Sequence, residues 1–242
     1  MAEESKTVNA VAKEGKQSKW NENTIEILVA VLLGVTALLM AWASWISSLH
    51  GGVQATNYTK SNNLASEGNS EYNAAVQLYL SDTMVWNTMM EYMFDLEIAE
   101  AENNQVRADL INAKLESYAD QNASEILLDG LKWMDENNAV SPFEMPGILD
   151  QYFVTANELL TESQELLEEG QRDNAKGDAY NLVSVIYSLV LFLLGIVSIF
   201  KRLPNRGAVL ILAAVILVLT TIYMCTLPLP TGFNLGNIIG LK

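Results

Sequence analysis

The carboxylates between residues 50 and 180 are the side chains whose spacing could support chemistry. Two pairs fall one helical turn apart, so each pair could share a hard cation such as Ca²⁺ or Mg²⁺. These pairs are Glu91 with Asp95 and Glu165 with Glu169. No EF-hand loop accompanies them, and helix carboxylates more often form a solvated surface. The pattern therefore favours at most weak binding of divalent cations.

The residue combinations that common enzyme mechanisms require are missing from the sequence. The chain contains one histidine and one cysteine, which cannot by themselves form a triad, a zinc site or a thiolate pair. The Glu-x-x-His motif of di-iron bundles and a phosphate-binding glycine loop are also absent. We predict no enzymatic activity and no cofactor. The single histidine, His50, is expected to be a solvated residue at the end of a membrane span.

Three long apolar runs determine which elements must position these groups. Residues 27–49, 182–200 and 208–227 contain no Asp, Glu, Lys or Arg. Each run is long enough to cross a bilayer, because ~20 helical residues cover the roughly 30 Å hydrocarbon layer. Lipid offers no partner to an unpaired backbone amide, so the spans must be helical. The predicted fold class is all-α, with three transmembrane helices.

The runs divide the chain into seven predicted segments. These are a polar tail (1–24), a first span (25–49), an acidic helical domain (50–180), a second span (181–200), a short basic loop (201–207), a third span (208–227) and a C-terminal tail (228–242).

Lysine and arginine residues predict the orientation of these segments. The cations of the tail and loop are Lys6, Lys13, Lys16, Lys19, Lys201, Arg202 and Arg206. The residues between the first two spans carry 24 Asp and Glu against six Lys and Arg. We predict that the chain crosses the plasma membrane. By the positive-inside rule, its N-terminus is cytoplasmic and its acidic domain is extracytoplasmic. A signal peptide cleaved after Ala41-Trp42-Ala43 is the alternative, but the apolar run continues past that site.

The acidic domain has the pattern of long helices. Residues 52–140 contain no proline, and large side chains recur at spacings of three and four, as on a buried helical seam. The seam consists of Tyr72, Val76, Tyr79, Thr83, Trp86, Met90 and Met93, and its expected partner stripe of Leu159, Leu160, Leu166 and Leu167. We predict an elongated, coiled-coil-like hairpin whose arms continue into the first two spans. Shorter helices are expected at its tip near residues 124–137, and a rigid turn at 141–146.

One face of the first span carries only small residues. They are Ala30, Gly34, Ala37, Ala41, Ser44, Ser48, Gly51 and Ala55. In lipid, no hydrophobic effect drives apolar helices together, so the close approach of backbones over small residues is a main source of helix association. The commoner partner of such a face is another span of the same chain. The alternative is a ring of first spans around a symmetry axis, which would leave a narrow, weakly polar passage.

Two short motifs carry a resemblance. Gly-Gly-x-Gln-Ala at residues 51–55 follows a Trp-bearing span, and Ser-Pro-Phe-x-Met-Pro occupies residues 141–146. In these motifs, and in the order of its elements from about residue 25 to 227, the chain resembles uncharacterised three-span membrane proteins of prokaryotes. The resemblance implies the topology and a prokaryotic origin. It implies no activity and no catalytic residues.

Two functions are compatible with these patterns. The first is a non-enzymatic integral membrane protein that self-associates, serving as an envelope scaffold or as an accessory subunit of a membrane complex. The alternative is an oligomeric channel for ions or solutes, with the acidic domain gathering cations at its outer mouth. The expected partners are the lipid bilayer, further copies of the chain or other subunits, and divalent cations. The acidic charge disfavours nucleic acid.

Overall fold

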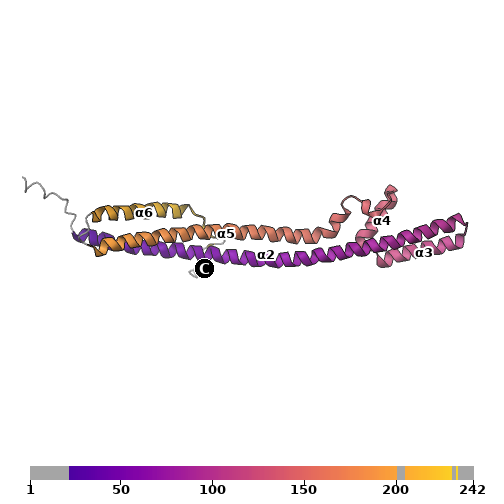
Figure 1. Ribbon diagram of the computed structural model, residues 1–242, viewed down its shortest axis with the longest axis horizontal. Helices are drawn as coiled ribbons and strands as arrows, with labels where there is room; N and C mark the ends of the chain where they lie inside the picture. The colour runs from indigo at the N-terminus through magenta and orange to yellow at the C-terminus, as the bar shows by residue number, and fades with distance from the viewer. Residues whose placement is uncertain (1–21, 201–204, 231–232, 234–242) are drawn as a thin grey trace, which may run out of the picture. The chain divides into compact units, whose positions relative to one another are not determined.

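Every secondary-structure element that the computed structural model describes is a helix, which confirms the all-α prediction for that part of the chain (Figure 1). The described residues are 22–200, 205–230 and 233. The elements are α2 (Glu22–Ala101), α3 (Gln105–Asn122), α4 (Glu125–Asn137), the 3₁₀-helix η1 (Pro142–Glu144), α5 (Ile148–Ile199) and α6 (Arg206–Thr226).

Helices α2, α5 and α6 are each long and apolar enough to cross a membrane, as predicted. Only α6, with 21 residues, matches the length of a single span. Helix α2 has 80 residues and α5 has 52, so each contains a candidate span and continues well beyond it. Gly51 and Gly52 lie inside α2 and do not interrupt it.

The chain divides into two compact units. The membrane unit contains the described residues up to Ala55 and from Gly170 onward, and the intervening unit is Thr56–Glu169. All three candidate spans contribute to the membrane unit, whereas α3, α4 and η1 belong to the intervening unit.

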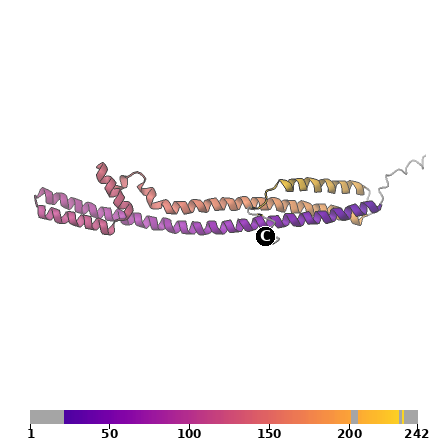
Figure 2. The ribbon, with the colours of Figure 1, turned by 180° about the vertical axis from the view of Figure 1, so that it is seen from behind.

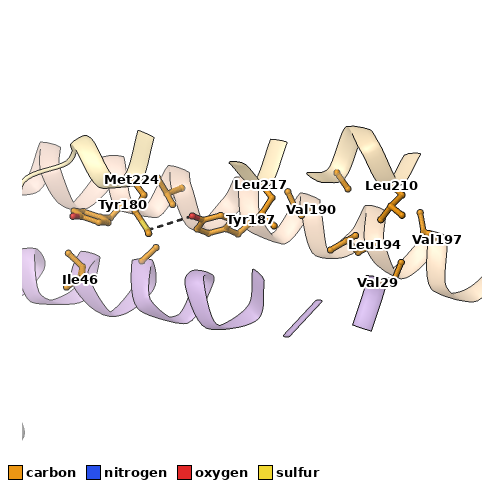
Figure 3. Close-up of a cluster of buried hydrophobic side chains, with 13 residues drawn as sticks. Val29, Ile46, Tyr180, Tyr187, Val190, Leu194, Val197, Leu210, Leu217 and Met224 are labelled. Atoms are coloured by element: carbon orange, nitrogen blue, oxygen red, sulfur yellow. Dashed lines mark hydrogen bonds between the residues drawn. The ribbon is translucent and has the colours of Figure 1, made fainter. Parts of the chain in front are cut away.

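Helix α5 lies at the centre of the membrane unit, between α2 and α6 (Figure 3). One face of α5 is buried at spacings of three and four, through Tyr180, Val183, Tyr187, Val190, Leu194 and Val197. Side chains of α2 such as Ile46 and of α6 such as Leu217 complete the same apolar cluster. The Tyr187 hydroxyl contacts the hydroxyl of Thr221 on α6 at 3.0 Å. This face holds the three candidate spans together.

In the intervening unit, α2 is contacted by three other helices. Tyr72 and Phe153 pair α2 with α5, and Tyr92 and Tyr118 pair α2 with α3. Both ribbon views show α3 running beside the last part of α2 (Figures 1 and 2). The buried residues Val85, Trp86 and Met89 of α2 form a cluster with Ala119 of α3 and Leu127 of α4.

The predicted seam on α2 is partly wrong. Tyr72, Met90 and Met93 are exposed by 46%, 44% and 38%. Trp86 is buried as predicted, and the other buried positions from residue 75 onward are Ala75, Asp82, Val85, Met89 and Ala99. The physical reason is that three helices, α3, α4 and α5, contact α2. The buried part of its surface is therefore wider than the seam of a two-helix hairpin, and it is rotated relative to the predicted seam.

The predicted tip is also incomplete. Helix α2 continues to Ala101, and the chain reverses at residues 102–104, where Asn103 adopts a left-handed φ of 54°. Helix α3 follows this turn and was not predicted as a separate element. Helix α4 agrees with the expectation near residues 124–137, because Ser124 caps its first turn by accepting from the Leu127 N–H. The turn at 141–146 contains η1, with Pro142 at its start.

Several predicted segments lie partly outside the described residues. These are the polar tail 1–24, the basic loop 201–207 and the C-terminal tail 228–242. Of the seven cations that predict the orientation, six lie outside the described residues, and only Arg206 is described. The orientation in the membrane therefore stays a prediction.

Candidate functional site

The small-residue face of α2 is not covered within the membrane unit. Of its eight residues, seven are exposed and Gly51 is half-buried. A Cβ atom added at Gly34 or Gly51 would meet nothing within 4 Å. At one edge, the Ser44 hydroxyl contacts the Ser184 hydroxyl of α5 at 3.1 Å. The interpretation that this face receives another span of the same chain is therefore wrong for the described residues.

A neighbouring face of α2 makes the intrachain contacts instead. Its buried residues are Val29, Thr36, Ala43, Ile46, Ser47 and His50. The Thr36 hydroxyl donates to the Leu32 carbonyl within the helix at 2.7 Å, so this buried hydroxyl is satisfied. The Ser47 hydroxyl donates to the carbonyl of Gly177 on α5 at 2.8 Å. These contacts leave the small-residue face beside the packed one, open to a further helix.

His50 is fully buried, so the expectation of a solvated interfacial histidine is wrong. Its Nδ1 lies 3.1 Å from Oδ1 of Asp173 on α5. Its Nε2 lies 3.2 Å from the backbone carbonyl oxygen of Pro228, which follows α6. The ring also stacks on Tyr180, with 5.9 Å between centroids. One side chain therefore joins α2, α5 and the segment after α6.

The surroundings of His50 are polar and closely packed. Lys176 Nζ lies 3.1 Å from the same Oδ1 of Asp173 that His50 contacts. The Tyr180 hydroxyl donates to the Leu227 carbonyl at 3.3 Å. A Cβ at Gly177 would lie 3.4 Å from His50 Cβ, an ordinary van der Waals contact, so α5 packs directly against His50 here. We call this group of residues (His50, Asp173, Lys176, Gly177, Tyr180, Leu227 and Pro228) the polar junction.

Aromatic rings extend the contact between α2 and the end of the chain. Phe233 packs edge-on against Trp42 and Trp45, with ring centroids 6.3 and 5.9 Å apart. Trp42 and Trp45 also contact each other at 5.3 Å. Residues 227–230 and 233, the C-terminal segment, are thus held on α2 by the His50–Pro228 contact and by ring contacts. Sequence reasoning missed this segment, since no local pattern pairs it with α2.

A second buried carboxylate lies in the intervening unit. Asp82 of α2 accepts from the Ser124 backbone N–H at 3.0 Å, from the Ser124 hydroxyl and from the Tyr152 hydroxyl at 2.7 Å. Burial, together with the hydrogen bond to Asp82, raises the pKa of the Tyr152 phenol. The three donors satisfy a charge that is 1% exposed, which indicates a structural role.

The predicted cation-binding carboxylates are all exposed. Glu91 and Asp95 lie on α2, and Glu165 and Glu169 lie on α5. Within the described ranges, no group of three or more His, Cys, Asp or Glu residues is placed to hold a metal ion. Binding by either pair of carboxylates stays an untested prediction.

The intervening unit also contains an open groove of about 570 Å³ between α2, α3 and α4. Its apolar lining includes Trp86, Met89 and Met134, and carboxylates such as Glu116 and Asp135 lie among the lining residues. Met89 and Met93 of α2 therefore line the groove, and Met89 also belongs to the apolar cluster.

No protein family, no curated protein and no solved structure matches the chain. The interpretation of function therefore rests on the residues and on their geometry. The resemblance to prokaryotic three-span membrane proteins stays a prediction.

Proposed function

We propose that this chain is a non-enzymatic integral membrane protein that associates with copies of itself through the small-residue face of α2. One observation carries the proposal. This face permits the closest approach of a second backbone, and α5 and α6 leave it uncovered.

The physical argument depends on how helices associate in lipid. A small-residue face gains van der Waals contacts and weak hydrogen bonds when another backbone approaches it, whereas lipid tails fill the same space less densely. Larger exposed side chains, Val31, Val35 and Leu38, lie to one side of the face, and the packed face lies to the other. The small-residue face is therefore a groove between these two sides, and a second copy of α2 would fit its ridge of side chains into this groove.

The remainder of the chain suits a scaffold or an accessory subunit. We propose that residues 50–180 form an acidic, coiled-coil-like hairpin outside the plasma membrane, with the N-terminus and the 201–207 loop in the cytoplasm. Two contacts within the intervening unit support antiparallel arms. Ser61 meets Ser163 at 3.2 Å, and further along α2, Tyr72 meets Phe153 at 5.0 Å between centroids.

Cysteine cross-linking in native membranes tests the association. In a Cys225→Ala background, Ala37→Cys and Ala41→Cys should each give disulfide-linked dimers or higher species. Val218→Cys is the matched control, because Val218 is 56% exposed but lies on α6, away from the small-residue face of α2. Equal yields at all three positions, or no product at positions 37 and 41, would refute the proposal.

A channel is the alternative function, and the exposed hydroxyl of Ser48 on the small-residue face favours it. A ring of α2 helices would line a passage with such weakly polar groups, and the acidic residues would concentrate cations near its mouth. Purified protein in planar bilayers should then conduct, with Ser48→Leu reducing the conductance. Silent bilayers at every voltage and calcium concentration would exclude the channel and leave self-association intact.

A further inference from the structure

The open groove between α2, α3 and α4 keeps apolar side chains accessible within an acidic unit. Both ribbon views show α3 running beside the last part of α2, whereas α4 leaves α2 at an angle (Figures 1 and 2). The groove of about 570 Å³ lies between these helices. Large apolar residues from all three helices line it, namely Met93 and Leu96 of α2, Leu115 of α3, and Leu131 and Met134 of α4. Met93 is 38% exposed and the other four are half-buried, so the lining offers apolar contact to a partner.

Carboxylates also belong to the lining of this groove. Glu116 and Asp120 come from α3, and Asp135 comes from α4. All three are exposed, and within the described ranges none of them has a hydrogen bond or an ion pair. The described lining contains a single cation, Lys132. Because negative charge is in excess, we call this site the acidic groove.

The two cations of α3 do not neutralise the acidic groove. Arg107 Nη1 lies 3.2 Å from Oε2 of Glu102, in the turn before α3. Lys114 Nζ lies 4.0 Å from the centroid of the Tyr92 ring. Neither Glu102 nor Tyr92 lines the groove. The carboxylates of the groove therefore remain available to cations from outside the chain.

Apolar contact and unpaired negative charge together restrict what can occupy the groove. A second copy of this unit fits poorly, because the residues between the first two spans carry 24 Asp and Glu against six Lys and Arg. A small molecule is usually enclosed by its site, with roughly 70–90% of its surface buried, whereas this groove is open. An amphipathic helix can instead lie along an open apolar groove and keep its other face in water.

We propose that the acidic groove is the docking site for a cationic amphipathic helix of a partner protein. The apolar face of that helix contacts the methionine and leucine side chains of the groove, and its Lys or Arg side chains pair with the carboxylates. The inference concerns the intervening unit and does not depend on self-association through α2.

The positions of the carboxylates specify the charge pattern of the partner. Glu116 and Asp120 lie one turn apart on one face of α3, which suits two cations spaced by one turn on the docked helix. Asp135 lies on a different helix, α4, so a further cation belongs on the other flank of the apolar face. Long Lys and Arg side chains can cover apolar surface while their charged ends reach carboxylates at its edge. The methionines adapt readily to the shape of a partner side chain.

Peptide binding to the full-length protein tests the proposal. The protein is placed in nanodiscs of phosphatidylcholine, which has no net charge, and empty nanodiscs serve as the blank. The probe is a fluorescent helix of about 14 residues, roughly four turns, with a leucine stripe and lysines on both flanks. The probe should bind, and its affinity should fall as salt concentration rises, because ions screen exposed charges. Failure of the probe to bind would overturn the proposal.

Two control peptides separate the contributions of charge and apolar contact. One has glutamate in place of every lysine, and the other has the composition of the probe in an order without a leucine stripe. Neither should bind. Equal binding of the glutamate peptide would show that charge does not select the partner, and equal binding of the reordered peptide would show that no apolar face is read. Either result would overturn the proposal.

Charge reversal locates the binding site. Glu116→Lys combined with Asp120→Lys should weaken binding of the probe by at least about tenfold, since two attractions become repulsions. Glu165→Lys combined with Glu169→Lys is the matched control, because it changes two exposed carboxylates one turn apart on α5. Equal losses of affinity in the two double variants would mean that the probe responds to overall charge, and would overturn the proposal.

A neutral substitution tests the apolar contact. Met93→Gln should weaken binding of the probe about fivefold, because it replaces an apolar contact of the groove with a polar side chain. Met90→Gln is the control, since Met90 is 44% exposed on the same helix but does not line the groove. If both variants bound the probe as tightly as the wild type, docking in the acidic groove would be wrong.

Discussion

The hydroxyl of Tyr152 donates a hydrogen bond of 2.7 Å to the carboxylate of Asp82, and both side chains are buried. The same carboxylate accepts from the backbone N–H of Ser124, the residue that caps α4. A single acidic residue of α2 thus fixes where α4 begins and how α5 packs. Among the described residues of the intervening unit, the other acidic side chains are mostly exposed, so Asp82 is the carboxylate most important for the fold of that unit.

Replacement of Asp82 should destabilise the intervening unit strongly. Asp82→Ala removes the acceptor of three donors, and each hydrogen bond to a charged group is worth about 1.5–3 kcal/mol, so we expect a loss of at least about 3 kcal/mol. Urea unfolding of the full chain in nanodiscs, followed by circular dichroism, measures it. Asp95→Ala is the control, because Asp95 is exposed and its replacement should change stability by at most about 0.5 kcal/mol. Equal effects of the two substitutions would contradict the structural role.

The raised pKa of Tyr152 predicts a loss of stability in alkali. The folded pKa lies above the unfolded value of about 10, so the contribution is fully present below about pH 10 and is lost as pH rises further. The wild type should therefore be more stable than Tyr152→Phe below about pH 10, by about 1.5–3 kcal/mol for one hydrogen bond to a charged carboxylate. Unfolding of both proteins across this pH range measures the difference. A difference that does not shrink in alkali would show that Tyr152 titrates normally.

Gly34→Leu should weaken self-association without affecting the fold of the monomer. Nothing lies within 4 Å of a Cβ at this position, so the leucine meets open space within the chain. In a dimer it would hold the backbones apart, and we expect a loss of about 1–2 kcal/mol of association, roughly a 5- to 30-fold weaker dimer. Energy transfer between labelled chains in liposomes measures this. Gly195→Leu is the control, because a Cβ at Gly195 on α5 would also meet nothing within 4 Å, and this variant should leave the dimer unchanged.

Gly130→Ala should destabilise the intervening unit although alanine favours helices. The added Cβ would lie 3.1 Å from both the Cβ and the carbonyl oxygen of Pro142, which cannot move aside easily. Overpacking costs about 1–3 kcal/mol and outweighs a helix-propensity gain of up to about 1 kcal/mol. Gly51→Ala, in open space on α2, should instead be neutral or stabilising. Thermal unfolding of the two variants should shift in opposite directions or by clearly unequal amounts.

The features that could be predicted from the sequence are local ones. A run of about 20 residues without charge predicts a span whatever the rest of the chain packs against it. All three such runs lie in helices. Ser124 caps α4 with its own side chain, and Pro142 starts η1, so both boundaries follow from adjacent residues. The reversal at Asn103 was missed because only a short polar turn, residues 102–104, separates the end of α2 from the start of α3.

Tertiary structure alone decided which faces of these helices are covered. Helical periodicity shows that Gly34 and Ala41 share a face, but not whether α5 lies against it. In water, apolar side chains mark the buried face, whereas in lipid both the packed and the exposed faces are apolar. Hydropathy therefore cannot distinguish them. The partners of His50 and Asp82 are likewise distant in sequence, with Asp173 lying 123 residues from His50 and Tyr152 lying 70 from Asp82. The sequence shows that a polar residue such as His50 or Asp82 will need a hydrogen-bond partner if it is buried. Only the packing of the helices determines which residue is that partner.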